Sequence, residues 1–134
     1  MTQRSRRSSR TIGYWTATGL VTSALLMGGA ADALHWHPTA EGMTRLGYPM
    51  YFLTILGLWK IAGVAALLWP GFRLVKEWAY AGVFFLLTGA LVSHAVCGEW
   101  TLMIAPLVLV VLTVASWMLR PRDRMLGVPA ASTM

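Results

Sequence analysis

Four long runs of apolar residues alternate with short polar segments along the chain. The runs cover residues 12–31, 50–69, 78–97 and 101–119. Each approaches or reaches the roughly 20 residues that an α-helix needs to span the hydrocarbon layer of a bilayer. The pattern predicts an all-α membrane protein, an antiparallel bundle of four transmembrane helices over residues 12–119, with disordered tails at residues 1–11 and 120–134.

The basic residues fall almost entirely on one side of this predicted bundle. Of the eleven Lys and Arg, Arg45 alone lies in the connector 32–49 and Lys60 lies inside the second run. The others precede the first run, follow the fourth, or lie between the second and third: Arg4, Arg6, Arg7, Arg10, Arg73, Lys76, Arg120, Arg122 and Arg124. Because cytoplasmic segments carry the excess of Lys and Arg, both termini are predicted to be cytoplasmic.

Composition supports the same interpretation. Hydrophobic residues make up 57% of the chain and charged residues only 12%. A soluble domain of this length needs more polar residues to cover its surface. The net charge of +6 is confined to short segments between apolar runs, so the expected partner is the lipid bilayer and no nucleic acid. The single cysteine, Cys97, cannot form an intrachain disulfide, which excludes an internal paired-thiol relay.

The N-terminal segment has a second interpretation. SRRSSRTIGYW, followed by an apolar run and GGAAD, imitates a twin-arginine or secretory signal with a small-residue cleavage site. The run is longer than a typical signal core, however, and it lacks the apolar pair expected after the arginines. We therefore expect the first helix to be retained as a membrane anchor.

Lys60 lies at the centre of the second run, where a charged residue costs roughly 2.5 to 3.5 kcal/mol on insertion scales. Gly57 and Gly63 lie three residues to either side, share its helical face and allow a neighbouring helix to approach closely. We therefore expect Lys60 to face the bundle interior. Counted from the cytoplasmic helix ends, no carboxylate lies at its depth.

The direction of helical side chains suggests partners for this lysine. Side chains lean towards the N-terminus of their own helix, so Lys60 leans outward and His94, on an outward-running helix, leans back towards it. Asp32 and His35, at the outer end of the first helix, lean inward as well. The sequence thus predicts a polar column of Asp32, His35, His94 and Lys60 that opens on the outer face.

Four interpretations of this column stay open. The residues can serve helix packing alone, or line a cavity for a quinone or other lipid-like ligand. They can hold a metal or haem through His35, His37 and His94, although no His-x-x-x-His spacing within one helix supports this. They can also form a path for protons or small solutes. The cofactor expectation is therefore no metal, no haem, and a quinone or lipid-like ligand at most.

Two other features have simple explanations. Glu77, at the start of the third helix, offsets the positive end of the helix dipole, and a functional carboxylate is the alternative. It leans away from Lys60, which disfavours a bond between the two. Gly82 and Gly89, seven residues apart, share one face of the third helix and are expected to provide close packing.

The segments YFLTILGLWKIAGVAALLWPG, KEWAYAGVFFLLTGALVSH and CGE resemble the DoxX-like family of small four-helix bacterial membrane proteins, over roughly residues 12–119. The matching positions are Lys60, Gly63, Pro70, Glu77, Trp78, Ala79, Tyr80, Gly82, Gly89, Ala90, Ser93, His94 and Gly98. The resemblance implies a multi-pass protein of the bacterial inner membrane, with Glu77, Trp78 and Tyr80 as polar motif residues at a helix terminus.

In this family, one relative is a subunit of a thiosulfate to quinone oxidoreductase and others associate with antioxidant enzymes. The resemblance therefore implies an accessory or subunit of a membrane redox system, with a redox protein as partner. The chain has no recognisable flavin, nucleotide or iron–sulfur motif, so it is not expected to be a stand-alone enzyme. The alternatives are a non-catalytic structural or assembly protein, and a small-solute permease, which would require a homo-oligomer.

Overall fold

The computed structural model describes residues 3–127, with side chains from Ser8 onward, and this part of the chain is helical without strands. Its α-helices are α1 (Gln3–Ala33), α2 (His37–Arg45), α3 (Met50–Leu68), α4 (Arg73–Val96) and α5 (Ile104–Leu119). Two short 3-10 helices, η1 (Trp100–Met103) and η2 (Arg122–Arg124), flank α5. The all-α class predicted from the sequence is confirmed.

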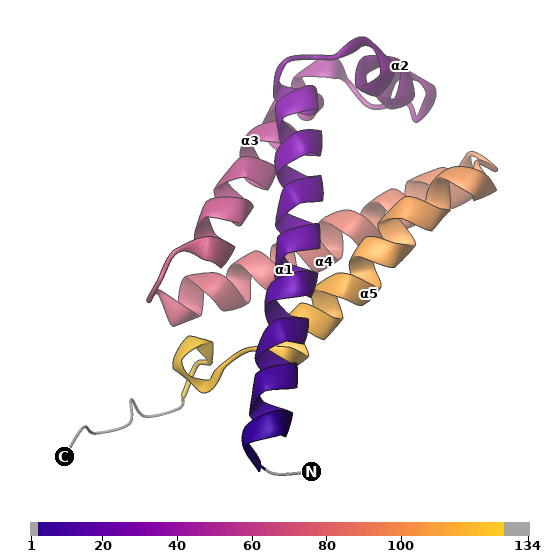
Figure 1. The fold of residues 1–134 in the computed structure, drawn as a ribbon. Helices are drawn as coiled ribbons and strands as arrows, with labels where there is room; N and C mark the ends of the chain where they lie inside the picture. Colours follow the sequence, from indigo (N-terminus) through magenta and orange to yellow (C-terminus); the bar gives the residue numbers. More distant parts are fainter. Residues whose placement is uncertain (1–2, 128–134) are drawn as a thin grey trace.

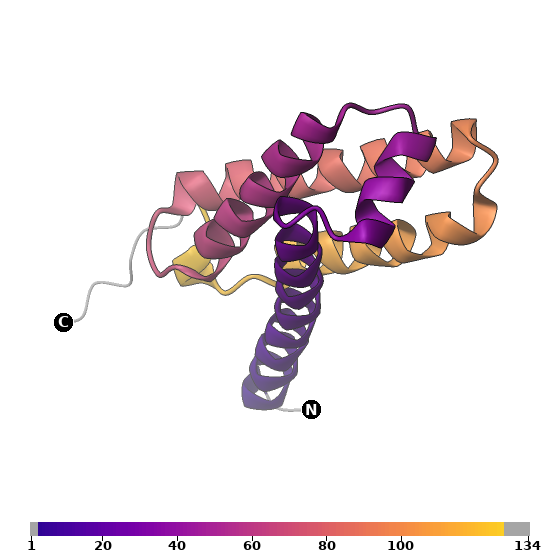
Figure 2. The same cartoon turned by 90° about the horizontal axis from the view of Figure 1, so that it is seen from above.

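The four long helices form a ring of contacts. Helix α1 packs against α3 and α5, and α4 packs against α5 and α3. The chain reverses direction between successive long helices, and α4 and α5 lie side by side in both views while α1 crosses them steeply (Figures 1 and 2). The short helix α2 lies across the end of α1, to which it is bent by 83°.

Two different kinds of packing hold the ring together. A hydrophobic cluster fills its middle, formed by Val21, Leu25, Val64, Leu67, Tyr80, Val83 and Leu87. Between α1 and α3 the backbones themselves come close, because a Cβ placed on Gly57 would lie 2.6 Å from Ala33 N and 2.7 Å from Gly29 O. Glycine at position 57 is therefore what allows the two helices to touch.

Three helices, α3, α4 and the combined η1–α5 segment Trp100–Leu119, are long and apolar enough to cross a membrane. The bent pair α1 and α2 passes the same test only when it is counted as one span. Large apolar side chains point away from the ring, among them Trp59 and Phe85, each 71% exposed. Such an apolar exterior suits lipid rather than water, so the structure is that of a multi-pass membrane protein.

Several helix boundaries differ from those expected. Residues from Gln3 onward belong to α1 rather than to a disordered tail, and α4 begins at Arg73 rather than at residue 78. The expected start was set by the first apolar residue in both cases. The helix itself begins earlier, because polar residues such as Arg also have a high helix propensity. The expected outer connector contains α2, and η2 and the buried Arg120 lie in the expected C-terminal tail. The rest of that tail, residues 128–134, lies outside the described residues.

Candidate functional site

Lys60 and Asp32 form an ion pair between α3 and α1. Lys60 Nζ lies 2.5 Å from Asp32 Oδ2, and the two side chains are only 19% and 6% exposed. The close approach at Gly57 brings the end of α1 alongside the middle of α3. The amine therefore faces the neighbouring helix and meets a carboxylate there.

This pair joins two members of the expected column, Asp32 and Lys60, although the sequence places no carboxylate at the depth of Lys60. A carboxylate does lie within reach of Lys60, because α1 ends beside Gly57, well inside the outer end of α3, and the long lysine side chain covers the remaining distance. His94 also has a different partner. Its Nδ1 hydrogen-bonds Glu99 Oε2 at 2.7 Å. The expected lean of His94 towards Lys60 is thus replaced by a local contact five residues along its own chain.

Glu99 is the centre of a separate polar cluster at the ends of α2 and α4. Arg45 Nε donates to its Oε1 at 3.1 Å, while His94 contacts the other oxygen. Nearby, the hydroxyls of Tyr48 and Ser93 lie 2.8 Å apart. The hydrogen bond from His94, supported by the positive charge of Arg45, lowers the pKa of the Glu99 carboxyl from its usual 4.5. This cluster fastens the α2–α3 connector to the end of α4.

The remaining histidines have their own partners. His35 Nε2 lies 2.7 Å from Thr54 Oγ1 on α3, and its backbone adopts a φ of 52°, in the left-handed region, at the bend between α1 and α2. His37 and Glu41 form an exposed pair at 3.5 Å on α2. Within residues 8–127, no three His, Cys, Asp or Glu side chains gather where they could hold a metal ion.

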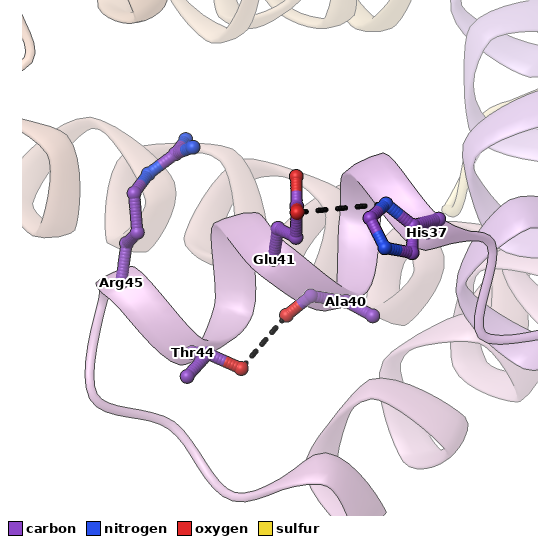
Figure 3. A pocket seen from close by; sticks show the side chains of 5 residues that line it. All are labelled: His37, Ala40, Glu41, Thr44 and Arg45. Carbon is purple, nitrogen blue, oxygen red and sulfur yellow. Dashed lines mark hydrogen bonds and ion pairs between the residues drawn. The ribbon is translucent and has the colours of Figure 1, made fainter.

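The side chains of α2 border an open hollow of about 570 Å³. Figure 3 shows the His37–Glu41 pair on its edge and the hydroxyl of Thr44, which donates to Ala40 O at 3.0 Å. All the bordering residues belong to this one nine-residue helix. The side chains of His37, Glu41 and Thr44 bond along it, and Arg45 bonds Glu99. The hollow therefore lacks walls from other elements that would enclose a ligand.

A more promising space is a groove of about 510 Å³ between α3 and α4. Its lining is formed by Leu25, Phe52, Ile55, Leu56, Trp59, Lys60, Ala62, Gly63, Ala66, Val75, Trp78, Ala79, Gly82, Val83 and Leu86. Lys60 is the one charged residue on these walls. Gly82 leaves the groove open, since a Cβ there would meet nothing within 4 Å, and one at Gly63 would only reach Val83 Cγ2 at 4.0 Å. The expected close packing at Gly63, Gly82 and Gly89 is therefore absent, and the close approach of α1 and α3 occurs at Gly57 and Gly29 instead.

Glu77, on α4, joins that helix to α5. Its Oε1 lies 2.8 Å from Arg120 Nη1, and its Oε2 accepts a hydrogen bond of 3.0 Å from Trp117 Nε1. The Arg120 guanidinium, only 4% exposed, also lies over the Tyr80 ring at 4.9 Å. Glu77 thus neutralises a buried cation just after the end of α5, which is a more specific task than offsetting a helix dipole.

The other motif residues of this region divide between core and groove. The Tyr80 hydroxyl lies 2.8 Å from Ser116 Oγ, which lies 2.7 Å from Thr18 Oγ1, so three helices share one buried chain of hydroxyls. Trp78, by contrast, is 67% exposed and borders the groove. Tyr80 therefore stabilises the packing of the helices, and Trp78 lines the groove.

The burial of Lys76 was not expected from the sequence. Lys76 is 1% exposed, and its amine donates to Ala66 O at 2.8 Å, to Leu67 O at 3.1 Å and to Trp69 O. It thereby satisfies carbonyls that the end of α3 leaves without helical partners. A basic residue shortly after the Pro70–Gly71 break was the available signal.

Comparisons with known proteins agree with this architecture. The model of the DoxX-like family matches residues 16–116, which include α2, α3, α4 and most of α1 and α5. Neither curated proteins nor solved structures gave a match.

Proposed function

The chain belongs to the DoxX-like family, and from that premise we propose that it is an accessory or subunit of a redox system in the bacterial inner membrane. In this proposal four spans form an antiparallel bundle with both termini in the cytoplasm. The groove between α3 and α4 holds a quinone or a similar amphipathic ligand beside Lys60. The chain itself carries out no complete reaction, and a partner protein or the quinone supplies the redox chemistry.

The groove with Lys60 on its wall is the observation that carries this proposal. Its volume of about 510 Å³ falls within the range of small-molecule sites, which are typically lined by apolar groups with few polar ones. The α3 residues on its wall run from Phe52 to Ala66, a length of about 21 Å at about 1.5 Å per residue. An apolar groove of this length suits an alkyl or isoprenoid chain.

Lys60 provides a hydrogen-bond donor partway along this groove. An ammonium group has three N–H donors, and Asp32 is the hydrogen-bond partner that the described residues supply to it. Two donors are left for a ligand. A quinone carbonyl oxygen is an acceptor that fits this requirement.

Native mass spectrometry of the protein purified in mild detergent tests the proposal. We expect a co-purifying quinone, or added decylubiquinone, to remain bound to the wild-type chain. Gly82→Leu fills the groove and should reduce binding at least tenfold. Gly89→Leu is the matched control, because it lies on the same helix, meets equally open space and does not border the groove.

A structural or assembly role is the second candidate, and one observation favours it. The Lys60–Asp32 pair joins α1 to α3 beside the glycine contact, which is where a packing element would be placed. In that case the wild-type chain binds no decylubiquinone, and Gly82→Leu and Gly89→Leu behave alike. That result would contradict the ligand proposal.

A further inference from the structure

We infer that Asp32 makes the groove selective for uncharged amphipathic molecules that carry a carbonyl oxygen, and against fatty-acid anions. The inference rests on the proposed function, because it specifies the class of ligand that the same groove accepts. It concerns a residue behind the wall rather than on it.

The first step is the charge of the pair. Asp32 Oδ2 and Lys60 Nζ are 2.5 Å apart and both side chains are largely buried. The positive charge of the ammonium and the negative charge of the carboxylate cancel, so the ion pair has no net charge. The one charged residue on the groove wall, Lys60, therefore brings no uncompensated positive charge to it.

The second step is the effect of this neutrality on a ligand. Apart from Lys60, the groove is lined by apolar residues and glycines. A carboxylate that entered would lose hydration and find its only cation already neutralised by Asp32, which makes its transfer unfavourable. An ester or quinone carbonyl brings no charge and still accepts a hydrogen bond. Neutral acceptors are thus favoured over anions of the same chain length.

The third step separates charge from shape. Asp32 is absent from the groove walls, so a substitution there changes the charge behind Lys60 and leaves the lining intact. In Asp32→Asn the amide oxygen still accepts a hydrogen bond from the amine, while the negative charge is gone. The ammonium then has no counter-ion, and a fatty-acid anion can supply it.

The test compares dodecanoate with methyl dodecanoate, which share a chain and differ in charge. Each is titrated into the purified protein in neutral detergent, at a pH where the acid is ionised, and bound molecules are counted by native mass spectrometry. Wild type should bind the ester at least tenfold more tightly than the acid. Asp32→Asn should reverse that order, and Asp32→Glu, which keeps the negative charge, should preserve the ester preference.

The outcomes distinguish this inference from the proposed function. If wild type binds acid and ester equally, or if Asp32→Asn leaves their ratio unchanged, the inference is overturned while a ligand-binding groove stands. If wild type binds neither of them nor decylubiquinone, the proposed function fails as well. Should Asp32→Asn not fold, the wild-type ratio and the Asp32→Glu ratio still decide.

Discussion

Lys60 and Asp32 lose hydration together, and their contact compensates for that loss. A buried charge without a partner is costly, whereas a buried pair can be replaced by apolar residues at little cost. The consequence for Lys60 is that its substitution cannot be interpreted alone. Removing the amine also leaves the Asp32 carboxylate, 6% exposed, without its counter-charge.

We expect Lys60→Met to destabilise the protein by about 3 kcal/mol, because it leaves the buried Asp32 carboxylate without its partner. The double variant Lys60→Met/Asp32→Ala should recover most of that loss. Unfolding in increasing SDS, followed by circular dichroism, measures both. A Lys60→Met protein as stable as wild type would mean that the pair contributes nothing.

Glu99 provides a pH dependence outside the membrane-spanning helices. Its pKa is lowered in the folded protein, first by the hydrogen bond from His94 and also by Arg45. Folding therefore gains stability that is present above the unfolded pKa near 4.5 and is lost as the pH falls through the folded value. Thermal unfolding should show wild type more stable than Glu99→Gln at neutral pH, with the difference shrinking below about pH 4.5. A difference that is constant across that range would show that Glu99 does not titrate with folding.

At the scale of single residues, the sequence predicts both members of the central pair but not their pairing. Lys60 is conspicuous because it interrupts an apolar run, and Asp32 because it ends one. Their contact depends on the register of α1 relative to α3, and that register follows from the backbone contact at Gly57 and Gly29. The periodicity of a single helix does not determine this register. The lean of the side chains alone favours His94 as a partner of Lys60, whereas in the structure His94 bonds Glu99.

At the scale of elements, hydropathy locates the four long helices but not their ends. The apolar runs lie within or close to the helices found, whereas the polar turns at Gln3 and Arg73 fall outside the runs. Helix α2 escapes detection because it is short and polar, although Pro38 in its first turn and Gly47 just after it, with a φ of 80°, are ordinary start and stop signals. Connectors are therefore where the sequence is least informative.

The α1–α3 contact yields a prediction with an internal control. Replacing glycine by alanine within a helix normally stabilises it by about 0.8 to 1 kcal/mol. At Gly57 the added methyl would collide with backbone atoms of Ala33 and Gly29, so Gly57→Ala should destabilise the protein by about 1 to 3 kcal/mol. Gly89→Ala meets open space and should be neutral or stabilising. Unfolding of both variants in SDS measures the two effects. Equal stabilities of Gly57→Ala and Gly89→Ala would contradict the close contact at Gly57.

At the scale of the whole molecule, the number of membrane crossings determines on which side the N-terminus lies. Helices α3 and α4 and the combined η1–α5 segment each qualify, whereas α1 qualifies only together with α2, across an 83° bend. Sequence could predict the helical class and the membrane environment from hydropathy alone. It could not predict this bend, because the polar segment after Ala31 is compatible with either a loop or a short helix.

Cysteine labelling distinguishes three spans from four. Cys97 is the single native cysteine and is exposed just beyond α4. With the basic segments held in the cytoplasm, a membrane-impermeant maleimide should label Cys97 in intact spheroplasts. On a Cys97→Ala background, Leu126→Cys should be labelled only after permeabilisation, whether there are three spans or four.

The labelling of Ser8→Cys on the same background distinguishes three spans from four. Four spans place it inside and protected, whereas a first helix that lies along the membrane surface would leave it outside and reactive. Labelling of Ser8→Cys in intact spheroplasts would therefore contradict the four-span bundle. It would also mean that Asp32, the partner of Lys60, belongs to a helix that does not cross the bilayer.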